Sequence, residues 1–443
     1  MSDTLTAITR SIPFRVFALA FLSILLLIPL SNLGDLVGER RGLRFKAASS
    51  IASGWGGRQT LLGPILVLAL DCPWTDDKGR TGVAQQIATR LPAKFSVEGE
   101  LATEVRRRGL HVVPVYRARL RTAFEFTAPT AALLESQCTG AHLRAASVVF
   151  AVSDPRGIDR ISPLATATSQ IVWLPGTPLS GPWQQGVQAP LPPDLLGEGS
   201  RPLALAAEID LRGSDRFALL PAGGETTVKL HADWPSPSFD GAFLPTSSAL
   251  GAAGFDAAWA VSELARPLPS IFHGDPPVEL QESAFGFTWF QPADGYLMTE
   301  RSLKYGFLFV VLTFLVFFFF ESTCERRLQP LQYGLIGGAL CIFYLLLLSL
   351  SERAGFTPAY LAAAAATTLQ IALYARALLG NARRAAVLGA ILTALYSGLF
   401  LLIGLEETAL LVGSVALFAL LTLAMWLTRG VGRARPRTGD ELT

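Results

Sequence analysis

The chain has 443 residues, of which 51% are hydrophobic and 16% are charged. Soluble domains carry about 25% charged residues, so this composition argues against a purely soluble protein. The formal net charge of +2 provides no basic field for nucleic acid, and we predict no nucleic-acid partner.

Uncharged stretches predict where the chain crosses a membrane, because a charge at the bilayer centre is costly. The first, 16–34, is predicted to be a transmembrane helix after a cytoplasmic N-terminus at 1–15. A cleaved signal peptide is the alternative for this stretch. Five more stretches predict a C-terminal transmembrane region at 305–428, and they lie at 305–320, 328–351, 354–375, 385–405 and 408–428.

Lys and Arg in the short loops set the predicted orientation. Nine arginines lie on one side, at Arg326, Arg327, Arg376, Arg383, Arg384, Arg429, Arg433, Arg435 and Arg437. Both termini are therefore predicted to be cytoplasmic, with a tail at 429–443, and the domain at 35–304 to be periplasmic. Four basic residues run against this rule, namely Arg40, Arg41, Arg44 and Lys46.

The segment 35–304 has the pattern of β-strands. Polar and apolar residues alternate from 117 to 126, as expected for a half-buried strand. Further strands are predicted at 203–211, 226–234, 257–264 and 285–290, and helices near 36–55 and 130–137. We predict a mostly antiparallel β domain, either a sandwich or an open barrel.

Two cysteines fall in this domain. Cys72 and Cys138 would lie in an oxidising compartment and could pair. The alternative is two buried thiols that behave as small hydrophobic side chains. The glycine-rich run at 54–59 lacks a phosphate-binding pattern and is interpreted as a tight turn that leads into a strand at 61–70.

No motif predicts catalysis. The four histidines have no metal-ligand spacing, and no nucleophile elbow is present. The interiors of the predicted spans contain no ionisable group of the kind that proton pathways require. We predict no catalytic residue, no cofactor and no metal, and therefore no enzyme.

Four residues are candidates for a contact surface. Trp234 and Phe239 lie in an aromatic, proline-rich segment and would either contact a partner or fill the β core. Glu406 and Glu407 form an acidic pair near a span end, interpreted as a solvated loop or as a cation site. A polar path near Gln370 would instead favour transport.

Four long segments resemble the CreD family of bacterial inner-membrane proteins, namely WGGRQTLLGPILVL at 55–68, ETTVKLHADWPSPSFDGAFLP at 225–245, TERSLKYGFLFVVLTFLVFFFFE at 299–321 and LQPLQYGLIGGALCIFYLLLLSLSE at 328–352. The resemblance implies an envelope protein with one span, a large periplasmic domain and a multi-span region. It also implies a role in envelope integrity, in colicin and β-lactam tolerance and in stress responses under two-component control. The expected partners are the lipid bilayer and envelope proteins or lipids. A transporter or lipid-handling subunit with a periplasmic receptor domain is the alternative.

Overall fold

A computed structural model describes residues 12–109, 111–128, 130–196, 202–266, 268–289, 295–323 and 328–405, with short pieces between 408 and 425. Contacts divide the chain into two compact units. The helical unit comprises Met1–Gly42 and Ala293–Thr443, and the β unit comprises Leu43–Pro292. These contacts place the ends of the β unit inside the predicted limits of 35–304.

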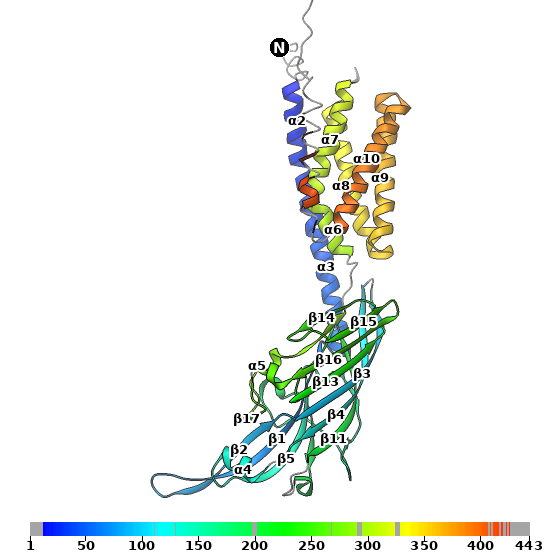
Figure 1. Ribbon diagram of the computed structural model, residues 1–443. Helices are drawn as coiled ribbons and strands as arrows, with labels where there is room; N and C mark the ends of the chain where they lie inside the picture. Colours follow the sequence, from blue (N-terminus) through cyan, green and yellow to red (C-terminus); the bar gives the residue numbers. More distant parts are fainter. Residues whose placement is uncertain are drawn as a thin grey trace, which may run out of the picture. The chain divides into compact units, whose positions relative to one another are not determined.

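Most of the described helices of the helical unit (Figure 1) are long and apolar, whereas α6 has ten residues and carries charged side chains. Four helical stretches are suited by length and composition to cross a membrane, the first being Phe14–Trp55. A fifth is a pair, α6 and α7, bent by 50°. The predicted span at 408–428 lies largely outside the described residues. The bounds are α2 (Ile12–Leu25), α3 (Leu27–Trp55), α6 (Gly295–Lys304), α7 (Gly306–Thr323), α8 (Pro330–Ala354), α9 (Phe356–Leu379) and α10 (Ala382–Gly404).

Local signals define the ends of α8 and α10. Gln329 and Gln332 form a capping box at the start of α8, where Pro330 occupies the first turn. The Asn381 side chain accepts from two amides of the first turn of α10. Within the bundle, a Cβ on Gly337 would collide with the Leu26 side chain. This glycine therefore permits α8 to pack closely against the N-terminal helical stretch at Leu26.

The β unit is built from two nine-stranded sheets. The order in sheet A is β14-β18-β12-β1-β5-β10-β9, with β2 beside β1 and β17 beside β2; in sheet B it is β15-β16-β13-β3-β4-β11-β7-β8, with β6 beside β11. Only β1–β12 and β3–β13 pair in parallel among the described strands. The bounds are β1 (Gln59–Thr75), β2 (Thr81–Arg90), β3 (Lys94–Arg108), β4 (His111–Phe126), β5 (His142–Val152), β6 (Ile158–Ile161), β7 (Leu164–Ala165), β8 (Gln170–Ile171), β9 (Leu174–Pro175), β10 (Gly186–Leu191), β11 (Leu203–Ser214), β12 (Arg216–Leu219), β13 (Glu225–Ala232), β14 (Pro237–Gly241), β15 (Ser247–Gly251), β16 (Gly254–Ser262), β17 (Ile271–His273) and β18 (Phe285–Trp289).

The two sheets enclose one hydrophobic core and form a sandwich. Aromatic rings bridge them: Phe124 of sheet B meets Phe150 of sheet A at 5.6 Å between ring centroids. Phe255 of sheet B meets Phe287 of sheet A at 4.7 Å. The predicted fold class, an N-terminal apolar helix, a mostly antiparallel β domain and C-terminal apolar helices, is therefore confirmed.

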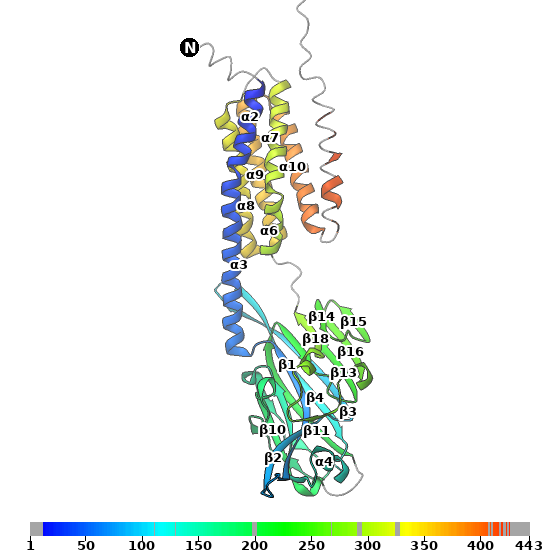
Figure 2. The same ribbon diagram turned by 90° about the vertical axis from the view of Figure 1, so that its left-hand side faces the viewer.

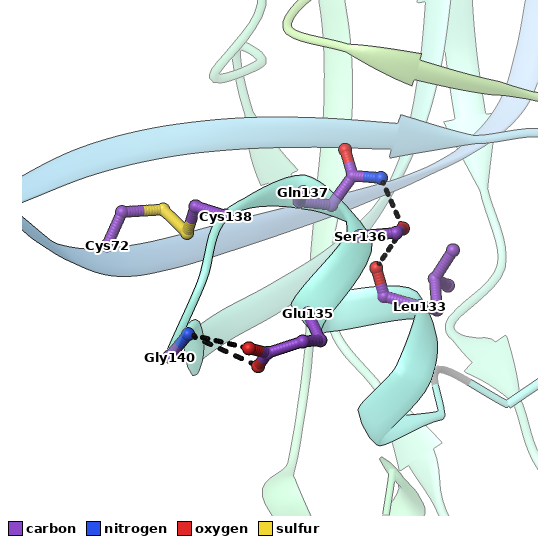
Figure 3. Close-up of a disulfide and its surroundings, with 7 residues drawn as sticks. All are labelled: Cys72, Leu133, Glu135, Ser136, Gln137, Cys138 and Gly140. Atoms are coloured by element: carbon purple, nitrogen blue, oxygen red, sulfur yellow. Dashed lines mark hydrogen bonds between the residues drawn. A yellow bond between two sulfur atoms is a disulfide. The ribbon is translucent and has the colours of Figure 1, made fainter.

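A two-stranded arm extends from the core. β1 and β2 stay paired from Leu66 and Arg90 out to Thr75 and Thr81, where a turn joins them, and β1 also pairs with β5 as far as Asp71, so the arm comprises 72–75 and 81–84. Cys72, at the inner end of the arm, forms a disulfide with Cys138, just after α4 (Ala131–Gln137) (Figure 3). This disulfide resolves the alternative that the sequence left open.

The predicted turn at 54–59 leads into β1. Gly56 has φ = +110°, a conformation that favours glycine. Asp154 secures this turn by accepting from the Gly57 amide at 3.2 Å. The Arg156 guanidinium, 2.8 Å from the same carboxylate, holds the pKa of Asp154 below its ordinary value despite opposing burial.

Trp55, the last residue of α3, lies against sheet B. The guanidinium groups of Arg106, Arg117 and Arg212 lie 4.2, 5.1 and 5.1 Å from its ring centroid. They come from β3, β4 and β11. Cation–π attraction thus attaches the end of α3 to three neighbouring strands.

Candidate functional site

Trp234 and Phe239 are half-buried and pack against the core of the β unit. The Phe239 ring meets Phe255 and Trp259 edge-on at 5.6 and 5.8 Å. The Trp234 indole nitrogen donates to the Ser236 carbonyl at 3.0 Å. Their contact with an envelope partner stays a prediction. Glu406 and Glu407 lie outside the described residues.

The exposed face of sheet B carries rows of opposite charges. In one row, Lys229, Glu98, Arg121 and Glu208 are successive cross-strand neighbours on β13, β3, β4 and β11. Arg121 Nε lies 3.5 Å from a Glu208 oxygen, and Lys229 Nζ lies 3.7 Å from a Glu98 oxygen. Opposite charges directly across a sheet favour each other.

A second row lies two residues along the same strands. His231, Glu100, Arg119 and Asp210 are its successive neighbours. Arg119 Nε is 3.5 Å from an Asp210 oxygen, and His231 also meets Asp256 with 2.9 Å between nitrogen and oxygen. Acidic and basic side chains thus lie side by side on this face of sheet B.

The two rows line a continuous shallow groove. Three adjoining hollows have volumes of about 450, 540 and 430 Å³. Glu98, Arg121 and Lys229 line the first and second, while Arg119 is shared by the first and third. Such a groove can bind an extended polar chain or a complementary protein surface.

Sequence reasoning missed this groove. Alternation identified the arginine-bearing face of β4, but the acidic partners stand on β3 and β11. Strand pairing over long sequence separations brings them together, and a single sequence does not specify the register. The sequence does contain one signal for the groove. Glu98 and Glu100 are spaced two residues apart in the segment that forms β3, and Arg119 and Arg121 have the same spacing in β4.

The helical unit contains a second polar site, at the bend between α6 and α7. Ser302, Tyr344 and Tyr396 bury hydroxyl groups for which the described residues provide no well-formed hydrogen bond. The Tyr344 hydroxyl lies against Gly306 at the start of α7, where a Cβ would be 3.2 Å away. Within a bilayer, a break in a helix is tolerated where it is buried or lines a wet cavity.

A hollow of about 610 Å³ lies between α9 and α10. Its lining is mostly apolar, and the hydroxyl-bearing residues in it are Tyr360, Thr368, Thr393, Tyr396 and Ser397. The Tyr360 hydroxyl donates to the Tyr396 carbonyl at 2.7 Å. The hollow suits an apolar chain with few polar groups.

An ion pair joins the first helix to the bundle. Arg15 Nη1 donates to Glu321 Oε1 at 2.8 Å. The Tyr333 hydroxyl donates to Glu321 Oε2 at 2.9 Å, and the Leu328 amide donates to Oε1 at 3.2 Å. The Glu321 side chain is 4% exposed, so this carboxylate depends on its protein partners.

Among the described residues, no three His, Cys, Asp or Glu side chains are grouped so that they could hold a metal ion.

These features define an integral membrane protein of several apolar helices with a β-sandwich unit and a charged groove. The family model for the inner membrane protein CreD matches residues 11–432. The chain therefore belongs to the CreD family of inner membrane proteins. It is 31% identical over 415 residues to the inner membrane protein CreD of Escherichia coli, covering 92% of this chain and 90% of that protein.

Solved structures show limited similarity. An M1 zinc metallopeptidase from Deinococcus radiodurans has a TM-score of 0.20 at 14% identity and covers 39% of each chain. A putative nutrient binding protein from Legionella pneumophila has a TM-score of 0.25 at 6% identity, covering 41% of this chain and 68% of that one.

Proposed function

We propose that this protein maintains the cell envelope and supports its response to stress through contacts of the β unit with envelope proteins or lipids. Colicin and β-lactam tolerance are the expected phenotypes, by the resemblance to the CreD family. The charged groove on sheet B is the observation that carries this proposal. It offers binding groups on an exposed face, and nucleic acid is not among the proposed partners because both signs alternate there.

We further propose that the β unit lies in the periplasm and both termini in the cytoplasm. The Cys72–Cys138 disulfide supports this orientation, because disulfides persist in oxidising compartments. The nine loop and tail arginines support it independently, through their expected retention on the cytoplasmic side.

Inverting one row of the groove tests the contact role. The variant Lys229→Glu/Glu98→Lys/Arg121→Glu/Glu208→Arg keeps every neighbour in the row opposite in sign but reverses the pattern that a partner meets. We expect normal protein level and thermal stability, with loss of colicin and β-lactam tolerance in a strain that lacks its own CreD relative. A folded variant that fully restores tolerance would refute a contact role for the groove.

A matched control lies on the same two central strands. Lys94 and Glu125 form a cross-strand pair of β3 and β4, with 3.6 Å between nitrogen and oxygen, outside the groove. Lys94→Glu/Glu125→Lys inverts this pair and should keep tolerance. A photoreactive residue at Ser96, which lines the groove, should also capture an envelope component that the inverted row no longer yields.

The bend in the helical unit favours a second candidate, a transporter or lipid-handling subunit. Buried hydroxyls beside a broken helix are the type of feature that lines polar pathways. In this case Ser302→Cys, in a background without the native Cys324 and Cys341, should react with a membrane-impermeant maleimide in intact vesicles. Absence of labelling, with Leu340→Cys equally unreactive as the buried control, would count against this candidate.

A further inference from the structure

The hairpin of β3 and β4 projects beyond the core of the β unit. Buried and exposed residues alternate along β3 as far as Ala102, but its last four residues are all exposed. Strand pairing nevertheless continues to Arg108 and His111. Burial in the core therefore does not explain the sequence of this projection.

The projection runs along the second half of α3. Arg106 stacks on Trp55, and two residues on, Arg108 donates a hydrogen bond to the Ser50 hydroxyl. These two contacts show that the hairpin tip points back along α3, where the light blue ribbon lies beside α3 in Figure 2. We define the basic hairpin surface as Arg44, Phe45 and Lys46 of α3 with Val105, Arg106, Arg107, Arg108 and Val112 of the hairpin.

This surface combines positive charge with exposed apolar side chains. No Asp or Glu occurs from 40 to 70 or from 105 to 116. Lys46 and Arg107 are exposed and form no ion pair with any residue that the structure describes. Phe45 is 75% exposed and Val105 56%. Basic and apolar groups together are typical of a surface that meets the headgroup region of a bilayer.

The chain itself brings this surface to a membrane. Val37 of α3 packs against Leu348, which lies within the predicted span 328–351, and Arg44 and Lys46 follow Val37 by seven and nine residues in the same helix. These separations correspond to about 10 and 14 Å of helix. A headgroup layer of about 5–7 Å and a Debye length of about 8 Å cover that distance.

We propose that the basic hairpin surface binds the phosphate headgroups of anionic phospholipids in the membrane that this chain crosses. Lysine and arginine attract anionic lipid across the headgroup layer and the Debye length beyond it. This binding goes beyond the proposed function and is independent of the orientation, because the tethering span precedes the surface on either side of the membrane.

Removing the two unpaired charges tests the electrostatic part. The full-length chain in neutral detergent is titrated with phosphatidylglycerol or with phosphatidylcholine of the same acyl chains, and bound lipid is counted by native mass spectrometry. Wild type should prefer phosphatidylglycerol, and Lys46→Gln/Arg107→Gln should weaken its binding about 30-fold. The control Lys78→Gln/Arg144→Gln removes two exposed charges of the β unit that likewise form no ion pair with described residues, and should change little.

Photocrosslinking locates the contact. In vesicles of phosphatidylcholine and phosphatidylglycerol at 3:1, a photoreactive residue at Phe45, which is 75% exposed, should capture lipid, with phosphatidylglycerol above its share of the mixture. The same residue at Leu264, which is 93% exposed elsewhere in the β unit, should capture none. Equal binding of the two lipids, equal losses in both double variants, or capture at Phe45 without phosphatidylglycerol enrichment would each overturn the proposal.

Discussion

The buried carboxylate of Glu321 should stabilise the helical unit through its pairing with Arg15. Their 2.8 Å contact corresponds to a gross attraction of about 6 kcal/mol at an effective dielectric constant of 20. Desolvation opposes most of it, and a net contribution of about 1.5–3 kcal/mol is typical of a hydrogen bond to a charged group. We therefore expect a coupling free energy of about 1.5–3 kcal/mol between the two side chains.

A double-mutant cycle measures this coupling. Arg15→Gln, Glu321→Gln and the double variant are unfolded as full-length chains by sodium dodecyl sulfate in mixed micelles. Circular dichroism at 222 nm is the suitable signal, because every tryptophan that the structure describes lies in the β unit. The losses of stability in the two single variants should sum to more than the loss in the double variant, because each single variant leaves one partner unpaired.

The same unit offers a control pair. Arg41 and Glu300 lie 3.4 Å apart, but their side chains are 57% and 38% exposed. Exposed pairs contribute at most about 1 kcal/mol, so the Arg41→Gln/Glu300→Gln cycle should give the smaller coupling. A coupling at Arg15 and Glu321 below about 0.5 kcal/mol, or no larger than in this control, would refute the reasoning.

Three further predictions concern the β unit. Replacing Cys72 and Cys138 by serine should lower its unfolding free energy by about 4 kcal/mol, from the entropy of a closed loop with a sequence separation of 66, measured by urea titration with tryptophan fluorescence. Tyr116→Phe should lower it by about 1–3 kcal/mol in the same assay, because the Arg216 carbonyl loses the buried hydroxyl that donates to it at 2.9 Å; an unchanged midpoint would contradict this. Asp154 has a lowered pKa and so stabilises the fold while ionised: the stability difference from Asp154→Asn should be full above about pH 5 and shrink as the pH falls below about 4, and a pH-independent difference would exclude this role.

Uncharged length and strand alternation were enough to predict the fold class. Five predicted spans correspond to apolar helical stretches, and the strands predicted near 117–126 and 203–211 are β4 and β11. Helix α6 was assigned to the outer domain instead, because Glu300, Arg301 and Lys304 interrupt its apolar pattern. Its buried side, with Tyr296 and Ser302, becomes apparent only once it packs in the helical unit.

The candidate sites were harder to predict than the fold. The groove requires the register of four strands, and the Arg15–Glu321 pair joins residues 306 positions apart. Aromatic residues drew the prediction to Trp234 and Phe239, whose rings pack against the core. Hydrophobicity reports burial well, but it does not distinguish a side chain that fills the core from one that meets a partner.

The position of Trp55 gives the β unit its own optical reporter. Its three guanidinium neighbours come from strands that are distant from Trp55 in sequence, so the ring reaches this environment only when β3, β4 and β11 are all assembled. In a chain in which Trp55 is the single tryptophan, the fluorescence emission of Trp55 should change when the end of α3 packs against sheet B. Packing of the sandwich against the end of its helix can then be followed without an added label in purified protein reconstituted into vesicles.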